Sequence, residues 1–287
     1  MHVTIIGVPY DLDLYHSGMG KAPQFLLDND LMQRLQVVGF TDVALEMIDG
    51  VPDGVTQQDR IGQVHAQVGT AITQARLAGS FPLVLGGDCV TSLGVLAGLN
   101  DSAHTGIVWF DAHGDFNTPD TTPSGYIGGM PLACAVGRGL MSLRNDIGLT
   151  TPIPESQVVL CGVRDLDVAE RQALDSSNVL VLTPYLMQRD QTVWVQVRQR
   201  LAHSSVYLHI DIDVLDPVEV PGVNYPTEQG LSLSELQHYI QLVGEVSTIS
   251  ALALTAVNPD QDVDHRTVNT AIMLIETTMQ QIYKALQ

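Results

Sequence analysis

The sequence predicts an α/β fold in which helices cover both faces of a mostly parallel β-sheet. Eight short apolar runs recur along the chain, and helix-like segments separate most of them. Strands that alternate with helices form parallel sheets, because each crossover helix returns the chain to the same end of the sheet. We expect strands at residues 3–8, 43–48, 82–87, 106–110, 157–163, 179–182, 206–212 and 249–257.

The helical segments are recognised by apolar residues spaced three and four apart. The pattern is clearest in "DRIGQVHAQVGTAITQARLAG", where Ile61, Val64 and Val68 share one face. Ser232 or Ser234 is suited to cap the helix that begins there. The other predicted helices span residues 23–35, 184–202, 232–246 and 267–286.

Size and charge narrow the class of protein. The chain has 287 residues, 45% of them hydrophobic, which is enough for one large core. No linker or charge block interrupts the alternation, so we predict a single domain over residues 1–287. The net charge is −19, with 13 basic and 32 acidic residues and no basic stripe. Nucleic acid and anionic membranes are therefore poor partners, because binding phosphates requires clustered Lys and Arg.

The sequence also predicts where the protein resides. No apolar run approaches the roughly 18 residues that span a bilayer. The opening "MHVTIIGVPYD" lacks the basic flank of a signal peptide and is interpreted as a first strand. Cys89, Cys134 and Cys161 are odd in number and far apart, which fits a reducing compartment. We expect a cytoplasmic protein whose partner is a small-molecule substrate.

Two strand-like runs end in clusters of potential metal ligands. "VWFDAHGDFN" carries Asp111, His113 and Asp115, two residues apart, and "LHIDIDVLDP" carries Asp211 and Asp213. Alternate residues of an extended segment lie on one face, so each cluster is expected to converge. Ligands bind at the carboxyl ends of parallel strands, where both clusters would lie.

Crowded carboxylates at buried strand ends repel one another unless a cation neutralises them. Oxygen-rich donors with an imidazole suit divalent ions such as Mn²⁺. Two ions that share carboxylates would lower the pKa of a bridging water and provide hydroxide near neutral pH. The alternative interpretation is that each cluster forms solvated turns and caps.

These motifs resemble those of the ureohydrolases, the family of arginase, agmatinase and formiminoglutamase. "GVPYDLDLYHSGMGKAP" is similar to the glycine-rich opening loop of that family, "GGDCV" to its Gly-Gly-Asp-His segment, "DAHGD" to Asp-Ala-His-x-Asp, and "DIDVLDP" to Asp-x-Asp-x-x-Asp-Pro. The resemblance covers nearly the whole chain. It implies a three-layer sandwich with a central, mostly parallel β-sheet, hydrolysis of a guanidino or amidino C–N bond, and a homo-oligomer, either a trimer or a hexamer.

The resemblance also implies two Mn²⁺ ions and the side chains that hold them. We define the first site as Cys89, Asp111, Asp115 and Asp211, and the second site as Asp111, His113, Asp211 and Asp213. Asp111 and Asp211 would bridge the ions, and Asp115 would accept a hydrogen bond from the attacking hydroxide.

Cys89 stands where the family has a histidine. Its thiolate is softer than imidazole, so the first site is expected to favour zinc, iron or cobalt, or to bind manganese differently. Alternatively, Cys89 is a small buried residue beside a weakened site. His209 is a candidate catalytic base, a ligand, a donor that orients a ligand, or a structural member of its strand.

The resemblance assigns the substrate's amino-acid end to four residues. Asn117 and Ser124 match positions that hold the substrate α-carboxylate, and Asp167 and Glu170 match positions that address the α-amino group. Turn formation by Asn117 and Ser124, and helix capping by Asp167 and Glu170, account for the same residues equally well.

Two further positions depart from the family at the reacting end of the substrate. Gly128 stands where arginases carry a histidine, and Ala256 where they carry the acid that faces the guanidinium. These departures leave open a less basic substrate of the N-hydroxyarginine type and a catalytically silent homologue that serves as a sensor or partner subunit. A nucleotide-binding protein is rejected, because "LGGDC" places an acid where phosphate would lie.

Overall fold

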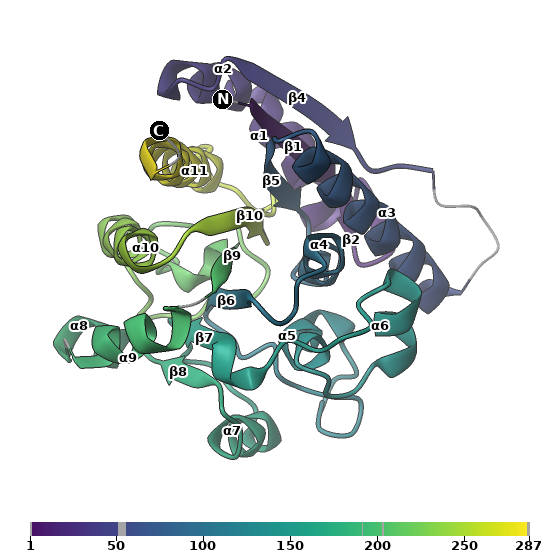
Figure 1. Cartoon of the computed structure of the whole chain (residues 1–287), viewed down its shortest axis with the longest axis vertical. Coiled ribbons are helices and arrows are strands. Elements are labelled where there is room, and N and C mark those ends of the chain that lie inside the picture. The colour runs from purple at the N-terminus through teal and green to yellow at the C-terminus, as the bar shows by residue number, and fades with distance from the viewer. Residues whose placement is uncertain (1, 51–55, 191, 203, 286–287) are drawn as a thin grey trace.

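One eight-stranded parallel sheet forms the centre of the fold, and helices pack against both of its faces (Figure 1). The computed structural model describes residues 2–50, 56–190, 192–202 and 204–285. The strands follow the order β4-β1-β5-β10-β9-β6-β7-β8. They are β1 (His2–Val8), β4 (Asp42–Met47), β5 (Phe81–Gly86), β6 (Thr105–Phe110), β7 (Val158–Cys161), β8 (Leu180–Leu182), β9 (Ser205–Asp211) and β10 (Ile249–Thr255). A separate two-stranded hairpin joins β2 (Tyr10–Asp11) to β3 (Leu14–Tyr15).

The helices divide into two layers, so the architecture is a three-layer α/β sandwich, as predicted. One layer contains α1 (Ala22–Asp28), α2 (Leu31–Val38), α8 (Pro184–Arg189), α9 (Thr192–Leu201), α10 (Leu233–Val246) and α11 (Arg266–Ala285). The other contains α3 (Gln57–Leu77), α4 (Thr91–Leu99), α5 (Pro131–Ala135), α6 (Met141–Ile147) and α7 (Val168–Asp175).

Alternation along the strands gives each helix layer its own apolar core. In β6, Val108 and Phe110 belong to one core and Ile107 and Trp109 to the other. Both faces of this central strand are covered, so every residue in it is buried. The edge strand β4 is largely exposed and carries charged residues, a composition that discourages edge-to-edge pairing.

All eight predicted strands are confirmed, with boundaries shifted by one or two residues. The predicted helix over 23–35 is wrong as a single element, because Asp30 adopts a left-handed φ of 67° and separates α1 from α2. The predicted helix over 184–202 is likewise two helices, α8 and α9, with residue 191 outside the described ranges. Residue 286 of the last predicted helix also lies outside them. Helices α4, α5 and α6 were not predicted, and α7 was anticipated only as a helix start that Asp167 and Glu170 would cap.

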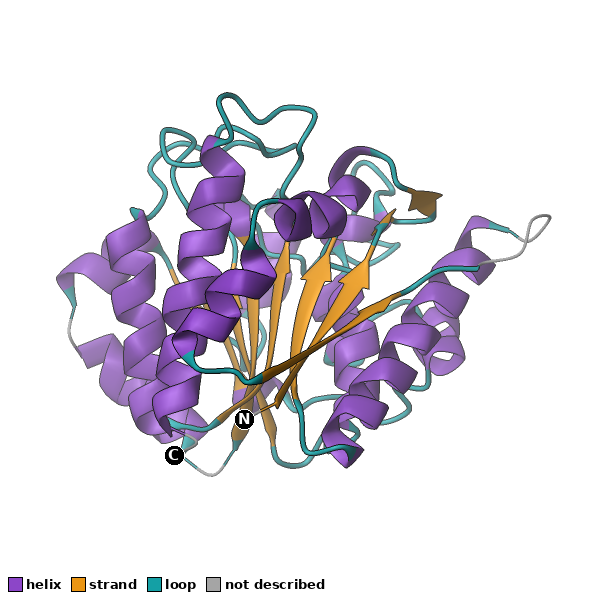
Figure 2. Cartoon of the chain, turned by 90° about the horizontal axis from the view of Figure 1, so that it is seen from above, coloured by secondary structure: helices purple, strands orange, loops and turns teal. Residues whose placement is uncertain are grey.

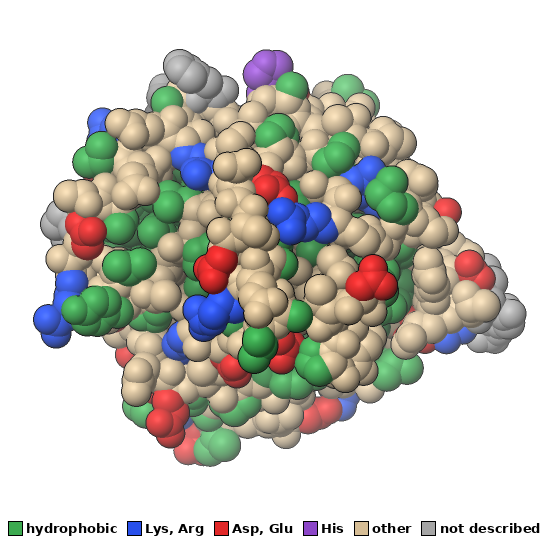
Figure 3. Space-filling view, turned by 90° about the horizontal axis from the view of Figure 1, so that it is seen from below, with side chains coloured by type: hydrophobic (Ala, Val, Ile, Leu, Met, Phe, Trp, Pro, Cys, Tyr) green, Lys and Arg blue, Asp and Glu red, His purple; other side chains and the backbone are tan. Residues whose placement is uncertain are grey.

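The strands point toward an edge where long loops gather, as Figure 2 shows. At that edge the loops after β5, β10, β9 and β6 are neighbours, since these four strands are adjacent in the sheet. The face shown in Figure 3 carries Lys and Arg side chains interspersed with acidic and apolar ones. Within the described ranges, every helix is too short or too polar to cross a bilayer.

Candidate metal centre

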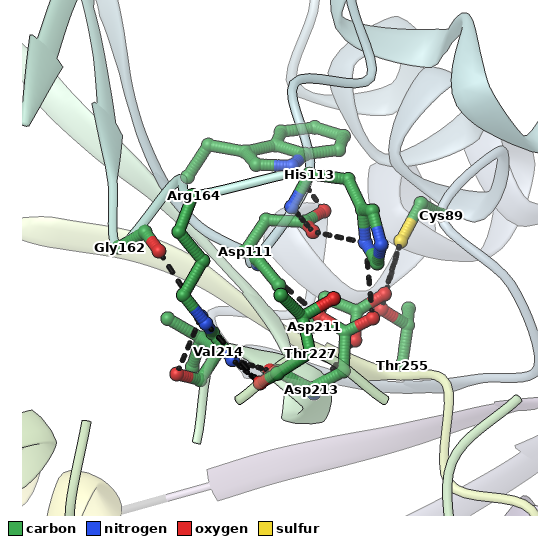
Figure 4. A network of polar contacts seen from close by, with 12 residues as sticks. Cys89, Asp111, His113, Gly162, Arg164, Asp211, Asp213, Val214, Thr227 and Thr255 are labelled. Carbon is green, nitrogen blue, oxygen red and sulfur yellow. Dashed lines mark hydrogen bonds and ion pairs between the residues drawn. The ribbon is translucent and has the colours of Figure 1, made fainter. Parts of the chain in front are cut away.

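The predicted ligands converge at the carboxyl ends of β5, β6 and β9. Figure 4 shows five of the six, namely Cys89, Asp111, His113, Asp211 and Asp213. Asp111 follows β6, Asp211 ends β9, and Cys89 lies just after β5. The side chains of Cys89, Asp111, Asp115, Asp211 and Asp213 are all buried. The structure therefore brings together residues that are far apart in the sequence.

Strand alternation is not what aligns the clusters, and that part of the prediction is wrong. Strand β6 ends at Phe110, and the chain then turns, with Asp115 in the left-handed region at a φ of 49°. Strand β9 ends at Asp211, and Asp213 lies in the 3₁₀ helix η4 (Ile212–Val214), where its N–H donates to Asp211 Oδ1 at 2.8 Å. Tight turns at the strand ends thus direct the carboxylates inward.

His113 and two carboxylates form one group of candidate ligands. The Nδ1 of His113 lies 3.3 Å from Asp111 Oδ1 and 3.1 Å from Asp213 Oδ2. Ligand atoms of these three residues all lie within 4.8 Å of one another. This group corresponds to the second site.

Cys89 lies at the centre of a second group. Its Sγ is 3.0 Å from Asp211 Oδ2 and 3.3 Å from Thr255 Oγ1. It is also 3.4 Å from His209 Nε2, and Cys89, Asp111 and His209 present ligand atoms within 4.8 Å of one another. This group overlaps the first site and adds His209 to it.

The electrostatics of the cluster fit a bound cation. Burial and neighbouring carboxylates raise the pKa of Asp111, Asp115 and Asp211, and burial with the same acids raises the pKa of the Cys89 thiol. Burial lowers the pKa of His113, but hydrogen bonds and charges from Asp111 and Asp213 outweigh it and raise that pKa to about 12. Without a metal, protons must supply the missing positive charge.

One carboxylate oxygen of the cluster is buried without a hydrogen bond from the described residues. Asp115 Oδ2 is buried and has no hydrogen-bond partner among the described residues. Leaving a buried carboxylate oxygen unsatisfied is costly, and a cation or a polar ligand removes that cost. The donor set of carboxylates, imidazole and thiol therefore fits a divalent metal centre.

Arg164, which sequence reasoning missed, fixes the loop that carries Asp213 (Figure 4). Its guanidinium donates to the backbone carbonyls of Asp213 at 2.9 Å, Thr227 at 2.7 Å and Gly162 at 3.1 Å. The only available signal was a single basic residue directly after an apolar strand in an acidic chain. By donating to these carbonyls, Arg164 holds the segment that carries Asp213 in place.

A pocket of about 490 Å³ opens over the cluster, with Cys89, His113, Asp115, Asp211 and Asp213 in its wall. All four predicted substrate-binding residues line it as well, namely Asn117, Ser124, Asp167 and Glu170. A small molecule can therefore contact the metal-binding side chains and these polar groups together.

The substrate-binding candidates also serve structural roles. Asn117 Nδ2 donates to Asp167 Oδ2 at 2.9 Å, and Ser124 Oγ accepts from the N–H of Tyr126 at 3.2 Å within a turn. Glu170 accepts from the N–H groups of Phe116 at 2.8 Å and of Asp167 at 3.3 Å, the latter as part of the α7 capping box. Burial raises the pKa of Glu170 to about 7. Capping and pocket lining are thus combined in the same side chains.

Tyr126 occupies the space beside Gly128, and sequence reasoning missed it. A Cβ added to Gly128 would lie 2.3 Å from Cε1 of the Tyr126 ring. Tyr126 lines the pocket and packs against Tyr225, with ring centroids 5.8 Å apart. Arginases are expected to carry a histidine at the position of Gly128. In this chain the phenol of Tyr126, two residues earlier, fills the adjacent space.

His209 lies beneath the pocket floor and is fully buried. Its ring stacks on Trp109 with centroids 3.6 Å apart, and its Nδ1 is 2.9 Å from the hydroxyl of Tyr207. Burial lowers its pKa to about 3, so the ring is neutral. His209 does not line the pocket, so it can act on a substrate only indirectly, through its contact with Cys89.

Known proteins match this chain over nearly its full length. A sequence model of the Arginase family matches residues 1–280. The arginase of Bacillus subtilis is 31% identical, over 96% of this chain and 97% of that enzyme, and the arginase of Bacillus caldovelox is 30% identical, over 95% and 96%. The crystal structure of arginase from Bacillus cereus superposes with a TM-score of 0.88 at 30% identity, covering 97% of this chain and 98% of that one. The chain therefore belongs to the arginase family and is an amidinohydrolase.

Proposed function

We propose that this amidinohydrolase cleaves a non-peptide C–N bond in an arginine-like amino acid, or in another amino acid with a guanidino or amidino group. One observation carries the proposal: a cluster of buried metal-type donors forms the floor of a pocket whose wall carries Asn117, Asp167 and Glu170. A substrate that contacts both parts has a reacting end over the donors and a polar end at the wall.

We further propose two divalent ions, with Mn²⁺ expected and another divalent transition metal admissible beside Cys89. Asp111 and Asp211 would be shared, since each lies among the candidate ligands of both sites. When bound, such ions supply Lewis acidity that makes water nucleophilic near neutral pH.

The chain's own residues have distinct tasks in this proposal. Asp115 Oδ2 is buried and has no hydrogen-bond partner within the described ranges, so it is suited to accept a hydrogen bond from the attacking hydroxide. Asp167 and Glu170 supply negative charge for an α-amino group, and Asn117 and Ser124 supply polar groups for an α-carboxylate. The turn and cap contacts of these residues hold them in place before substrate arrives.

The reacting end of the pocket distinguishes among substrates. Ala256 lines the pocket where a carboxylate would strengthen binding of a guanidinium cation. A less basic group, such as an N-hydroxyguanidine, depends less on that missing charge. The substrate panel therefore includes arginine, agmatine, N-hydroxyarginine and formimino amino acids.

The direct test combines two measurements on the wild-type protein. Metal content is measured after purification without added metal, and urea or ammonia release is then assayed over the substrate panel with each of several divalent ions. We expect bound metal and turnover of at least one amino-acid substrate. A folded protein with two bound ions that turns over none of these compounds would indicate a silent binding homologue.

A pair of matched variants separates substrate contact from capping. Glu170→Ala and Glu235→Ala each remove the N3 carboxylate of a capping box, at α7 and at α10, but only Glu170 lines the pocket. Each substitution removes a hydrogen bond to a backbone N–H, so both are expected to lower the free energy of unfolding by about 0.5–1.5 kcal/mol. Only Glu170→Ala should raise KM for the amino-acid substrate, and an equal effect of both variants on KM would remove Glu170 from the substrate site.

Assembly and location complete the proposal. We propose a single domain over 1–287 that forms a trimer or hexamer in the cytoplasm and has a small molecule, rather than nucleic acid or membrane, as its partner. The shared sheet, built from strands of both halves of the chain, supports the single domain, and three free buried thiols support a reducing compartment. The trimer or hexamer is proposed from the family resemblance. Light scattering coupled to gel filtration measures the oligomeric state, and a monomeric mass at micromolar concentration would contradict it.

A further inference from the structure

Two buried side chains face each other at the floor of the pocket, where Cys89 lines the pocket and His209 lies behind it. Cys89 follows β5, and His209 belongs to β9, with β10 between these strands. The two residues are 120 positions apart in sequence, yet Sγ of Cys89 lies 3.4 Å from Nε2 of His209. A thiol and an imidazole so placed are an ordinary pair of ligands for zinc-type ions.

We propose that His209 Nε2 and Cys89 Sγ together bind the ion of the first site, which thereby becomes a mixed sulfur, nitrogen and oxygen centre selective for Zn²⁺ or Co²⁺ over Mn²⁺. Asp111, Asp115 and Asp211 supply its oxygen donors. The inference rests on the proposed function only in that the cluster binds metal, and it assigns His209 to the ion rather than to the substrate.

The distances between donor atoms fit one shared ion. Ligands at about 2.3 Å for sulfur and 2.0 Å for nitrogen around a tetrahedral ion lie roughly 3.5 Å from each other. The observed separation of Sγ and Nε2 is 3.4 Å. A carboxylate oxygen of Asp111 lies within 4.8 Å of both, and Asp211 Oδ2 is 3.0 Å from the sulfur.

The surroundings of His209 hold its ring in the orientation that a ligand needs. The hydroxyl of Tyr207 lies 2.9 Å from Nδ1. In the proposed site this hydroxyl would accept the Nδ1 proton, and the Nε2 lone pair would then face the ion beside Cys89. Trp109 stacks on the ring at 3.6 Å and donates from Nε1 to Asp111 Oδ2 at 3.0 Å. One indole thus positions two ligands of the same site.

The second site differs in chemistry. His113 and the carboxylates of Asp111 and Asp213 form its compact group of ligands. With Asp211 they make a donor set that contains no thiol. Hard oxygen donors suit Mn²⁺, whereas thiolate selects softer ions. The two sites are therefore expected to take different metals when both Zn²⁺ and Mn²⁺ are offered.

Cobalt titration of the metal-free full chain tests the assignment without measuring activity. Bound Co²⁺ should give a thiolate-to-metal absorption band in the near ultraviolet. Cys89→Ser should abolish the band, while Cys161→Ser, which alters another buried thiol at the end of β7, should retain it. In competition with Mn²⁺, Cys89→Ser and His209→Gln should each weaken Zn²⁺ binding at one site by more than about 100-fold, since loss of an outer partner alone costs 10–100-fold.

Each outcome decides between the proposals. Zinc X-ray absorption on the wild type reports sulfur in the first coordination shell even if a variant fails to fold. Cobalt bound without the band, or Zn²⁺ affinity unchanged in His209→Gln, would overturn the mixed site while leaving the metal centre intact. A sulfur-bound ion in a protein without turnover would overturn the proposed function and leave this inference standing.

Discussion

Asp211 is the residue whose loss should affect the metal centre most. It accepts from the Cys89 thiol and from the N–H of Asp213, and it lies between the two groups of ligands. Asp211→Asn is expected to reduce metal content by close to two ions per chain, because it removes charge from both sites. Cys89→Ser should reduce it by no more than one.

Elemental analysis after dialysis against metal-free buffer gives the comparison. Asp146→Asn, at an exposed position in α6, serves as the control and should leave metal content unchanged. Higher metal retention in Asp211→Asn than in Cys89→Ser would contradict the bridging role.

Gly128 is constrained by the ring of Tyr126. Gly128→Ala should lower the free energy of unfolding by about 1 kcal/mol and displace the phenol from the pocket, because the new methyl group would overlap the ring. The adjacent Gly129→Ala has no heavy atom within 4 Å of its new Cβ and is the matched control. Urea denaturation measures both.

A double-variant cycle with Tyr126→Ala then identifies the cause. If the clash explains the loss, Gly128→Ala should cost little in the Tyr126→Ala background. If Gly128→Ala is equally destabilising in the Tyr126→Ala background, the loss of stability arises from the backbone at residue 128 and not from the clash. The same geometry means that Gly128→His, which would restore the residue expected of arginases, is accommodated only when Tyr126 moves.

At the scale of elements, glycines set how closely α4 packs on α3. A Cβ on Gly98 would lie 2.5 Å from the carbonyl oxygen of Gly69 and 2.5 Å from Cβ of Ile72. Gly98→Ala should therefore lower the free energy of unfolding by about 1–3 kcal/mol, since the helices must separate. Gly244→Ala in α10 has open space around its Cβ and should raise that free energy by about 0.5–1 kcal/mol through helix propensity.

Guanidinium denaturation curves of the two variants test this contrast directly. Opposite shifts of the midpoint are expected from the same chemical change in two helices. Shifts of the same sign would show that the α3–α4 contact is looser than the structure indicates.

At the scale of the molecule, metal binding should govern thermal stability. The chain carries a net charge of −19, and part of that charge is crowded at the metal centre. A ligand that binds only the folded state at 100 times its Kd adds about 2.7 kcal/mol, equivalent to roughly 4–5 °C for a chain of this size. Chelation should lower Tm by that amount in wild type and by much less in Asp211→Asn.

The pH dependence of this effect has a definite sign. The ligands must lose protons to bind metal, and burial and neighbouring acids raise the pKa of Cys89 and of Asp115. The gain in Tm on adding metal should therefore grow as pH rises from about 6 to 8. Calorimetry with and without chelator at several pH values measures it, and a gain that falls over this range would contradict thiolate ligation.

The sequence by itself determined the sheet, the ligand types and the family. Short apolar runs rich in β-branched residues favour strands, and their alternation with helices leads to a parallel sheet. Asp111, His113, Asp211 and Asp213 were identifiable because carboxylates that crowd together at the end of a buried strand need a cation to offset their repulsion. Helices α4, α5 and α6 were missed because they are short or, like α4, apolar on all sides and without periodicity.

Only the tertiary structure decided which side chains meet. The pairing of Cys89 with His209, the filling of the space at Gly128 by Tyr126, and the anchoring of the Asp213 loop by Arg164 all join residues through space. None of them leaves a local pattern in the sequence, since each depends on strand order and on turns such as that at Asp115. The residue type determines which chemical groups a position provides. The packing of distant strand ends determines which other groups they contact.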